Sequence, residues 1–344
     1  MFQPSSEIKA ARAARERAVN WLLDHIDSNG KPADAEARTG WSRLGWCLAV
    51  AGEYSAAGVV VDWAARNRIS QDGSYAPGFM EGQGYISQNA NYWLGTFVVS
   101  AWMAGRYDVA LRSMSYLRGQ QDPVLGGLPV RAAAGNHPEG IADILSTAQT
   151  GLSALVTGQL DVADKVYDWL SGLMAGQAKT GLTFHMIRKG REIWTNPSAD
   201  LAWSAIVPFD KPRQAFYGPG MAAVFLAPYA HMRQRPEALT LARTFLRYNM
   251  EGAEEQFTDV ESVQACKFGW AAGIMHQAEP DGGWLPWVHR MTQWFLDRQA
   301  PEGWWGPSRF ADSDPTIADR MVKTSEHAME LTVLLAALGS EQAG

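Results

Sequence analysis

Two acidic side chains, Asp143 and Glu261, stand at the start of long apolar segments. A carboxyl group among apolar side chains loses hydration, which raises its pKa and lets it donate a proton near neutral pH. We therefore expect Asp143 and Glu261 to be the general acid or base of an active site. A helix N-cap for Asp143 and a helix-dipole carboxylate for Glu261 are the structural alternatives, and both stay open.

Two further side chains, His327 and Tyr217, lie at or near the start of other apolar segments, and we expect them to be catalytic partners of the acids. His327 is followed by Ala328 and Met329, so its imidazole lies in an apolar stretch where it could transfer a proton. A core histidine satisfied by hydrogen bonds is the alternative interpretation.

Amide and aromatic side chains near the same segment starts are expected to contact the substrate. Buried amides need partners, and aromatic rings often wall apolar pockets. The predicted substrate-binding residues are Trp41, Tyr85, Asn89, Asn91, Tyr92, Trp203, Cys266 and Trp270. The same regions also contain charged side chains without a recognisable motif: Arg38, Arg43, Lys267, Lys323, Glu326 and Glu330.

An internal repeat indicates which elements position these side chains. Gly52, Gly105 and Gly158 are 53 residues apart, and a similar stretch follows each of them. The segment before each glycine is apolar nearly all round, which is typical of a buried helix, whereas the segment after it is amphipathic. Glycine between them suits a helix end that needs a left-handed residue. Asp108 and Asp161 are then predicted N-caps of the second helices.

The pattern extends over the whole chain as six pairs of inner and outer helices. The predicted inner helices are 41–51, 90–104, 144–157, 219–232, 262–277 and 325–338. The predicted outer helices include 7–25, 109–117, 162–174, 236–249 and 284–298. The first and last inner helices are apolar throughout, as expected if they meet. The sequence therefore predicts an all-α, single-domain (α/α)6 toroid over residues 1–344 rather than an open solenoid with polar capping repeats.

One interruption of the repeat falls at 182–216. Residues 182–187 and 192–195 read as a β-hairpin with its turn at Lys189 and Gly190, and an irregular segment, 196–216, follows. Long loops in regular scaffolds are commonly functional. We expect this insertion, with Trp194 and Trp203, to close one end of the ring and exclude water.

The composition excludes several classes of protein. The chain of 344 residues is 47% hydrophobic and 19% charged, with a net charge of −6 and no basic run, so we expect a globular protein that does not bind nucleic acid. Its apolar runs are too short to span a bilayer, and its start lacks the features of a signal peptide. Two cysteines give no disulfide framework, and a cytoplasmic location is expected. A homo-oligomer stays open.

Three motifs resemble a known superfamily. The stretch from Gln299 to Trp305 fits the Gln-x3-Gly-x-Trp turn of squalene and oxidosqualene cyclases, and the stretch from Gln71 to Tyr75 is a degenerate copy. Cys266 and Trp270 match the Cys-x3-Trp stretch of protein prenyltransferase β-subunits. The chain thus resembles the terpenoid cyclase and prenyltransferase α/α-toroid superfamily, but it lacks the Asp-rich motif, the aspartate before the zinc cysteine and the Cys-His-Gly signature of the known branches. The resemblance implies the toroid and not a reaction.

The absence of nucleotide-binding and nucleophile-elbow motifs favours acid–base chemistry without a cofactor. With 15 Trp, 10 Tyr and 12 Phe, the sequence predicts an aromatic cavity, and indole faces stabilise developing cations. We expect a cyclase, isomerase or dehydratase that acts on a hydrophobic, isoprenoid-like small molecule.

Three alternatives stay open. A carbohydrate-active enzyme would use paired carboxylates, Asp143 with Glu261, or Asp200 beside Trp203. A toroid that only binds a small molecule is the second. The third is a zinc site formed by Cys266, His327 and Glu261.

Overall fold

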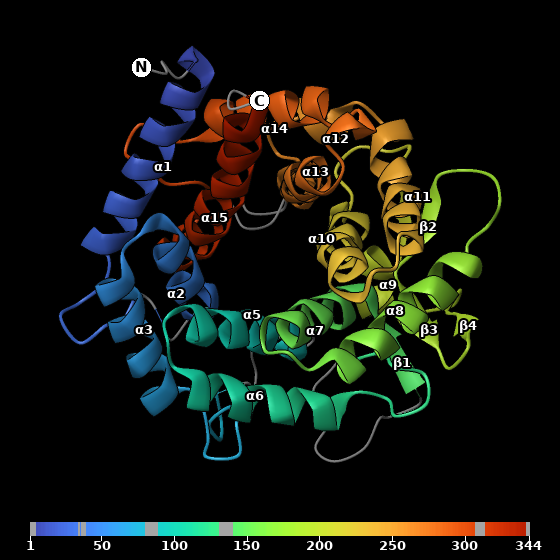
Figure 1. Ribbon diagram of the computed structural model, residues 1–344, viewed down its shortest axis with the longest axis horizontal. Helices are drawn as coiled ribbons and strands as arrows, with labels where there is room; N and C mark the ends of the chain where they lie inside the picture. Colours follow the sequence, from blue (N-terminus) through green and yellow to red (C-terminus); the bar gives the residue numbers. More distant parts are fainter. Residues whose placement is uncertain are drawn as a thin grey trace.

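The computed structural model describes residues 5–33, 35, 39–79, 89–130, 140–306 and 314–341. Six inner helices surround the centre of the molecule, and six outer helices cover them (Figure 1). The inner helices are α2 (Gly40–Ala51), α5 (Ala90–Met103), α7 (Ile144–Val156), α10 (Tyr217–Arg233), α13 (Cys266–Ala278) and α15 (Ile317–Glu341). The outer helices are α1 (Ser6–Asp24), α3 (Tyr54–Asn67), α6 (Tyr107–Gln120), α8 (Leu160–Ala175), α11 (Glu237–Glu251) and α14 (Leu285–Arg298).

The inner helices form a closed ring. Each packs against the next in chain order, from α2 through α5, α7, α10 and α13 to α15, and α15 packs against α2. The outer helix α1 covers α15, so the two ends of the chain meet in the ring (Figure 1). The all-α toroid predicted from the repeat is confirmed.

The difference between inner and outer helices follows from their apolar residues. In α5, every residue from Ala90 to Ala101 is buried, because helices pack against it on most sides. In α11, only one face is buried, and charged residues occupy the other. The three repeat glycines have positive φ angles at the ends of inner helices, as predicted.

The starts of two outer helices were predicted two residues too late. Helix α6 begins at Tyr107 after the N-cap Arg106, and α8 begins at Leu160 after Gln159. Asp108 and Asp161 therefore lie in the first turn instead of at the N-cap. They still favour the helix there, because a carboxylate interacts well with the positive end of the helix dipole.

A similar turn joins two of the units to the next outer helix in the ring. Gln121 donates from Nε2 to the carbonyl oxygen of Gly126 in its own turn and to that of Val162 in α8. Gln299 does the same with Gly303 and with Ala14 in α1. The Gln-x4-Gly turn at Gln121 and the Gln-x3-Gly turn at Gln299 are thus packing devices, in which a side-chain amide connects a turn to a helix.

The insertion after α8 contains short strands and one short helix. They are β2 (Thr183–His185), β3 (Ile187–Lys189), β4 (Glu192–Ile193), α9 (Ala199–Ala205) and β5 (Ile206–Pro208). The predicted hairpin is present as β3 and β4 only, and β3 also pairs with β1 (Ile141–Asp143). β2 pairs instead with β5, inside the segment predicted to be irregular. The chain switches partners at Met186, which donates to Ala205 and accepts from Ile144.

Candidate functional site

A small pocket opens where the insertion meets the first turns of α7 and α10. Its walls come from the starts of three inner helices, from β3 and from α9. The lining residues are Asn89, Val130, Asp143, Ile144, Leu145, Met186, Ile187, Leu201, Ser204 and Tyr217. Three predicted site residues, Asp143, Tyr217 and Asn89, are therefore brought together although they lie far apart in the sequence.

Asp143 is the acidic group of this pocket. It ends β1 and is the N-cap of α7, where one carboxylate oxygen, Oδ1, accepts a hydrogen bond of 2.8 Å from the backbone N–H of Ser146. Among the described residues, its second oxygen, Oδ2, has no hydrogen-bond partner. Burial raises the pKa of Asp143 to about 6, although the hydrogen bonds from Ser146 and Leu145 oppose the rise. The structure thus confirms the N-cap alternative and leaves one carboxylate oxygen available for proton transfer.

A second polar group, the ion cluster, is buried between α2, α13 and α15. It consists of Arg43, Lys267, Lys323, Glu326 and Glu330. Glu326 binds Arg43 at 2.6 Å, Lys267 at 2.5 Å and Lys323 at 2.6 Å, and Lys267 also binds Glu330 at 2.7 Å. Each of these side chains is buried. Such a group is stable only if its charges are paired, because the cost of desolvation is large.

The protonation states in and beside the ion cluster follow from its geometry. Burial opposes ionisation of Glu326, but Lys267, Lys323 and Arg43 together hold its pKa well below the usual range. Burial lowers the pKa of His327 to about 4, and Lys323 adds to this effect. The imidazole is therefore neutral at physiological pH, whereas both glutamates and all three cations are charged.

The donors for a metal ion are Cys266, His327 and Glu330, whose ligand atoms lie within 4.8 Å of one another. This set replaces Glu261 in the predicted zinc alternative. The ammonium of Lys267 already lies 2.7 Å from Glu330. Burial also raises the pKa of the Cys266 thiol well above its usual value, whereas a zinc ligand must be a thiolate. As arranged here, these residues do not fit a zinc ion.

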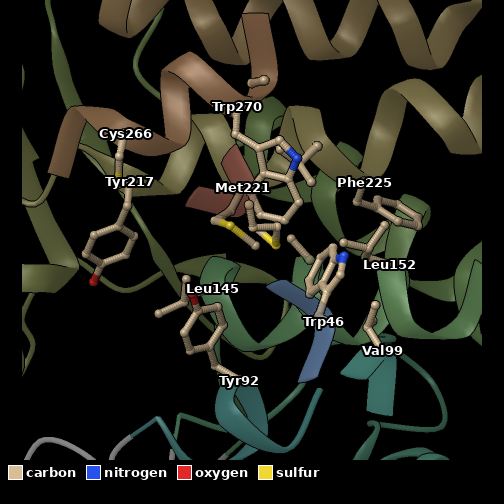
Figure 2. Packing of buried hydrophobic residues seen from close by; sticks show 14 of the residues in the cluster. Trp46, Tyr92, Val99, Leu145, Leu152, Tyr217, Met221, Phe225, Cys266 and Trp270 are labelled. Carbon is tan, nitrogen blue, oxygen red and sulfur yellow. The ribbon is translucent and has the colours of Figure 1, made fainter. Parts of the chain in front are cut away.

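Deeper in the ring, aromatic and sulfur-containing side chains from different inner helices converge. Trp46 of α2 and Trp270 of α13 make an edge contact with ring centroids 5.5 Å apart. Met221 of α10 lies between the two indoles, and Leu145 and Tyr92 lie next to each other to one side of them (Figure 2). The ammonium of Lys267 lies 5.2 Å from the centre of the Trp270 ring. The ion cluster therefore borders this group of buried apolar side chains.

Several other predicted substrate-binding residues have structural partners. Trp41 packs among the rings of Tyr75, Phe79 and Phe97. Asn91 donates to the carbonyl oxygen of Pro129.

The remaining predicted contacts have different outcomes. Tyr92 accepts from Arg43, and Cys266 lies 3.9 Å from Glu326 at the edge of the ion cluster. Trp203 is 38% exposed on α9, whose Leu201 and Ser204 line the pocket instead. Tyr85 lies outside the described residues.

Glu261 is not brought to the other predicted catalytic residues. Helix α13 begins at Cys266, so Glu261 precedes its first turn and cannot interact with the helix dipole as predicted. Its side chain is 51% exposed and pairs with Arg213, which also binds Asp259. His327 lies beside Glu330, away from the residues that line the Asp143 pocket.

Sequence reasoning noted the charges of the ion cluster without giving them a role. The available signal was their position in helices that are otherwise apolar, because a buried charge needs a partner. Lys323, Glu326 and Glu330 are also spaced by three and four residues, which places them on one face of a helix. The apolar pocket walls from Met186 and Leu201 carried no signal, since they depend on how the insertion folds.

Comparisons with known proteins identify the fold. No family model matches the sequence, and no curated protein matches it. A D-mannose isomerase structure is similar with a TM-score of 0.66 at 11% identity, covering 98% of this chain and 100% of that one. A family 76 glycoside hydrolase from a bovine Bacteroides thetaiotaomicron strain gives 0.63 at 13% identity, covering 95% and 77%. The type II terpene cyclase MstE from Scytonema gives 0.60 at 14%, covering 96% and 99%.

These neighbours are α/α-toroid proteins, so the chain has the toroid fold. Their titles name a sugar isomerase, a glycoside hydrolase and a terpene cyclase, and at these identities the likeness extends to the fold alone. The terpenoid branch within the superfamily is not singled out. Among the described residues, every helix is too short or too polar to span a bilayer.

Proposed function

We propose that this protein is an acid–base enzyme that acts without a cofactor on a small, largely apolar molecule. Asp143 is its proton donor, and Tyr217 and Asn89 orient the reacting group in the same pocket. The reaction class is an isomerisation, cyclisation or dehydration. In each, a proton is added to a double bond or a leaving hydroxyl, and the resulting carboxylate later recovers a proton from the substrate or solvent.

One observation carries the proposal: the buried carboxyl group of Asp143 has a pKa raised to about 6, and its Oδ2 has no partner among the described residues. A protonated acid of this kind donates efficiently near neutral pH. Trp46, Trp270 and Met221 are buried in the same hydrophobic core as Leu145, which also lines the pocket, so the surroundings of the pocket are apolar and aromatic and favour an apolar substrate (Figure 2).

The carbohydrate alternative agrees with two of the fold neighbours, but the local geometry favours it less. Most glycosidases need two carboxyl groups on either side of the scissile bond. Of the described residues, Asp143 is the only carboxylate that lines its pocket. Glu261, its proposed partner, is exposed and paired with Arg213.

The test is a comparison of the wild-type protein with Asp143→Asn, each incubated with lipid and polar cell extracts and followed by mass spectrometry. We expect the wild type to convert a lipid-fraction compound into a product of equal mass, or of mass lower by one water. Asp143→Asn should convert it at least ~100-fold more slowly. Glu261→Gln is the matched control and should keep full activity. Conversion of glycans alone, or full activity of Asp143→Asn, would contradict the proposal.

A further inference from the structure

The ion cluster contains more positive than negative charge. Arg43, Lys267 and Lys323 provide three cations, whereas Glu326 and Glu330 provide two anions. The imidazole of His327, beside Glu330, can only be neutral or positively charged, so it supplies no further anion. The five side chains of the cluster therefore carry a net charge of +1. An uncompensated buried charge is costly in a protein interior.

The hydrogen bonds of the cluster show the same imbalance. Among the described residues, the Nε–H of Arg43 has no acceptor, although its side chain is only 1% exposed. The indole N–H of Trp93, whose ring lies under the Arg43 guanidinium, also has no acceptor among these residues. Lys323 has three N–H donors and binds one carboxylate oxygen of Glu326. Two buried donors, on Arg43 of α2 and Trp93 of α5, thus have no acceptor among the described residues.

We propose that the ion cluster binds one carboxylate group of the substrate, through Arg43 and Lys323. A carboxylate contributes one negative charge, which balances the cluster, and oxygen atoms that accept from the unpaired donors. A phosphate dianion would overcompensate and leave a buried negative charge.

The surroundings indicate what the carboxylate is attached to. Lys267 lies 5.2 Å from the ring centre of Trp270, and Trp270 contacts Trp46. The ion cluster therefore borders the buried aromatic pair of Trp46 and Trp270. The ligand class is an amphipathic acid, with a carboxylate head at the ion cluster and an apolar body against the indoles. This inference rests on the proposed function only in taking the bound acid to be the substrate. Binding of such an acid can be measured without turnover.

The experiment measures binding of four probes to the full-length protein by calorimetry: octanoate, octan-1-ol, octylamine and octyl phosphate. We expect octanoate to bind at least ~10-fold more tightly than each of the other three. A tenfold difference in Kd corresponds to about 1.4 kcal/mol, which is the size expected for one charge-assisted contact. Equal binding of octanoate and octan-1-ol would overturn the proposal. Tighter binding of octyl phosphate would overturn the assignment to a carboxylate.

Substitutions then locate the site. Lys323→Met removes the excess charge and should weaken octanoate binding at least ~10-fold, whereas Lys323→Arg should stay within ~3-fold of the wild type. Lys179→Met, at an exposed lysine, is the matched control and should bind like the wild type. Unchanged octanoate binding by folded Lys323→Met would overturn the proposal.

Where Lys323→Met does not fold, the four-probe comparison on the wild type decides alone. Asp143→Asn should still bind octanoate. If octanoate binds the wild type no more tightly than the other probes, while activity still depends on Asp143, only the carboxylate site is refuted. If Asp143→Asn is fully active and the preference for octanoate holds, only the proposed chemistry is refuted.

Discussion

At the scale of single residues, the raised pKa of Asp143 has a consequence for stability. Its value of about 6 in the folded protein exceeds the value of about 3.9 for a free aspartate, so the folded state holds the proton more tightly. The resulting stabilisation is complete below the unfolded pKa and is lost as the pH rises through about 6.

Asp143→Asn lacks this titration but keeps an N-cap oxygen. Relative to the wild type, we expect its free energy of unfolding to rise by about 1 kcal/mol between about pH 5 and about pH 8. Urea unfolding of both proteins at the two pH values measures this change. The contributions of the other carboxylates cancel when the free energy of unfolding of the wild type is subtracted from that of the variant. A difference that does not change with pH would mean that the Asp143 pKa is not raised.

The ion cluster gives a second prediction at this scale. Glu326→Gln leaves three buried cations with only Glu330 as a counterion, and we expect it to lower the free energy of unfolding by about 3–5 kcal/mol. Glu261→Gln, in an exposed ion pair with Arg213, should cost at most about 1 kcal/mol. Urea unfolding at neutral pH checks both, and equal costs would contradict the account.

The sequence indicated part of this chemistry. Asp143 and Tyr217 were identified because polar residues before apolar helices stand out, and the structure places both in one pocket. Glu261 followed from the same rule, but its helix starts later, and Arg213 from the insertion pairs with it. The packing of an irregular insertion depends on long-range contacts, which one sequence does not reveal.

At the scale of elements, the turns between successive helices depend on glycine. Gly126 has a φ of +83°, and a Cβ there would overlap the carbonyl oxygen of Lys165 in α8. Gly158 has a φ of +74° with no atom within 4 Å of such a Cβ. A substitution at either position would force a side chain into a left-handed backbone conformation, but only a substitution at Gly126 would also create an overlap with α8.

We therefore expect Gly158→Ala to cost about 1–2 kcal/mol, the penalty of a left-handed conformation. Gly126→Ala should cost at least about 2 kcal/mol more, because the turn must move away from α8. Thermal or urea unfolding of the two variants gives the comparison. Equal destabilisation would show that the turn does not pack on α8 as described.

The helices were predictable because their periodicity is strong and recurs every 53 residues. Their boundaries were less so: α15 begins at Ile317 rather than near residue 325, and α6 begins before Asp108. Helix ends are decided by local capping that several neighbouring residues can supply. The pairing of β2 with β5 and of β1 with β3 escaped prediction, because segments of two or three residues carry no clear period.

At the scale of the whole molecule, the closed ring makes α15 essential. It packs between α13 and α2 and lies under α1, so its removal exposes apolar surface on all three helices. A chain that ends at residue 314 should show no cooperative thermal transition by circular dichroism. An open solenoid would tolerate the loss of one terminal repeat, and a sharp transition in the truncated chain would favour it.

The toroid itself followed from the apolar first and last inner helices, but the reaction did not, because the same fold serves different chemistries. The most direct test of the central claim is the pH dependence of turnover, once the extract comparison has supplied a substrate. We predict that kcat is constant below about pH 6, falls as the pH rises through about 6, and is at least ~100-fold lower in Asp143→Asn. A kcat that does not change through this range, or an Asp143→Asn variant as active as the wild type, would contradict the claim that Asp143 donates the proton.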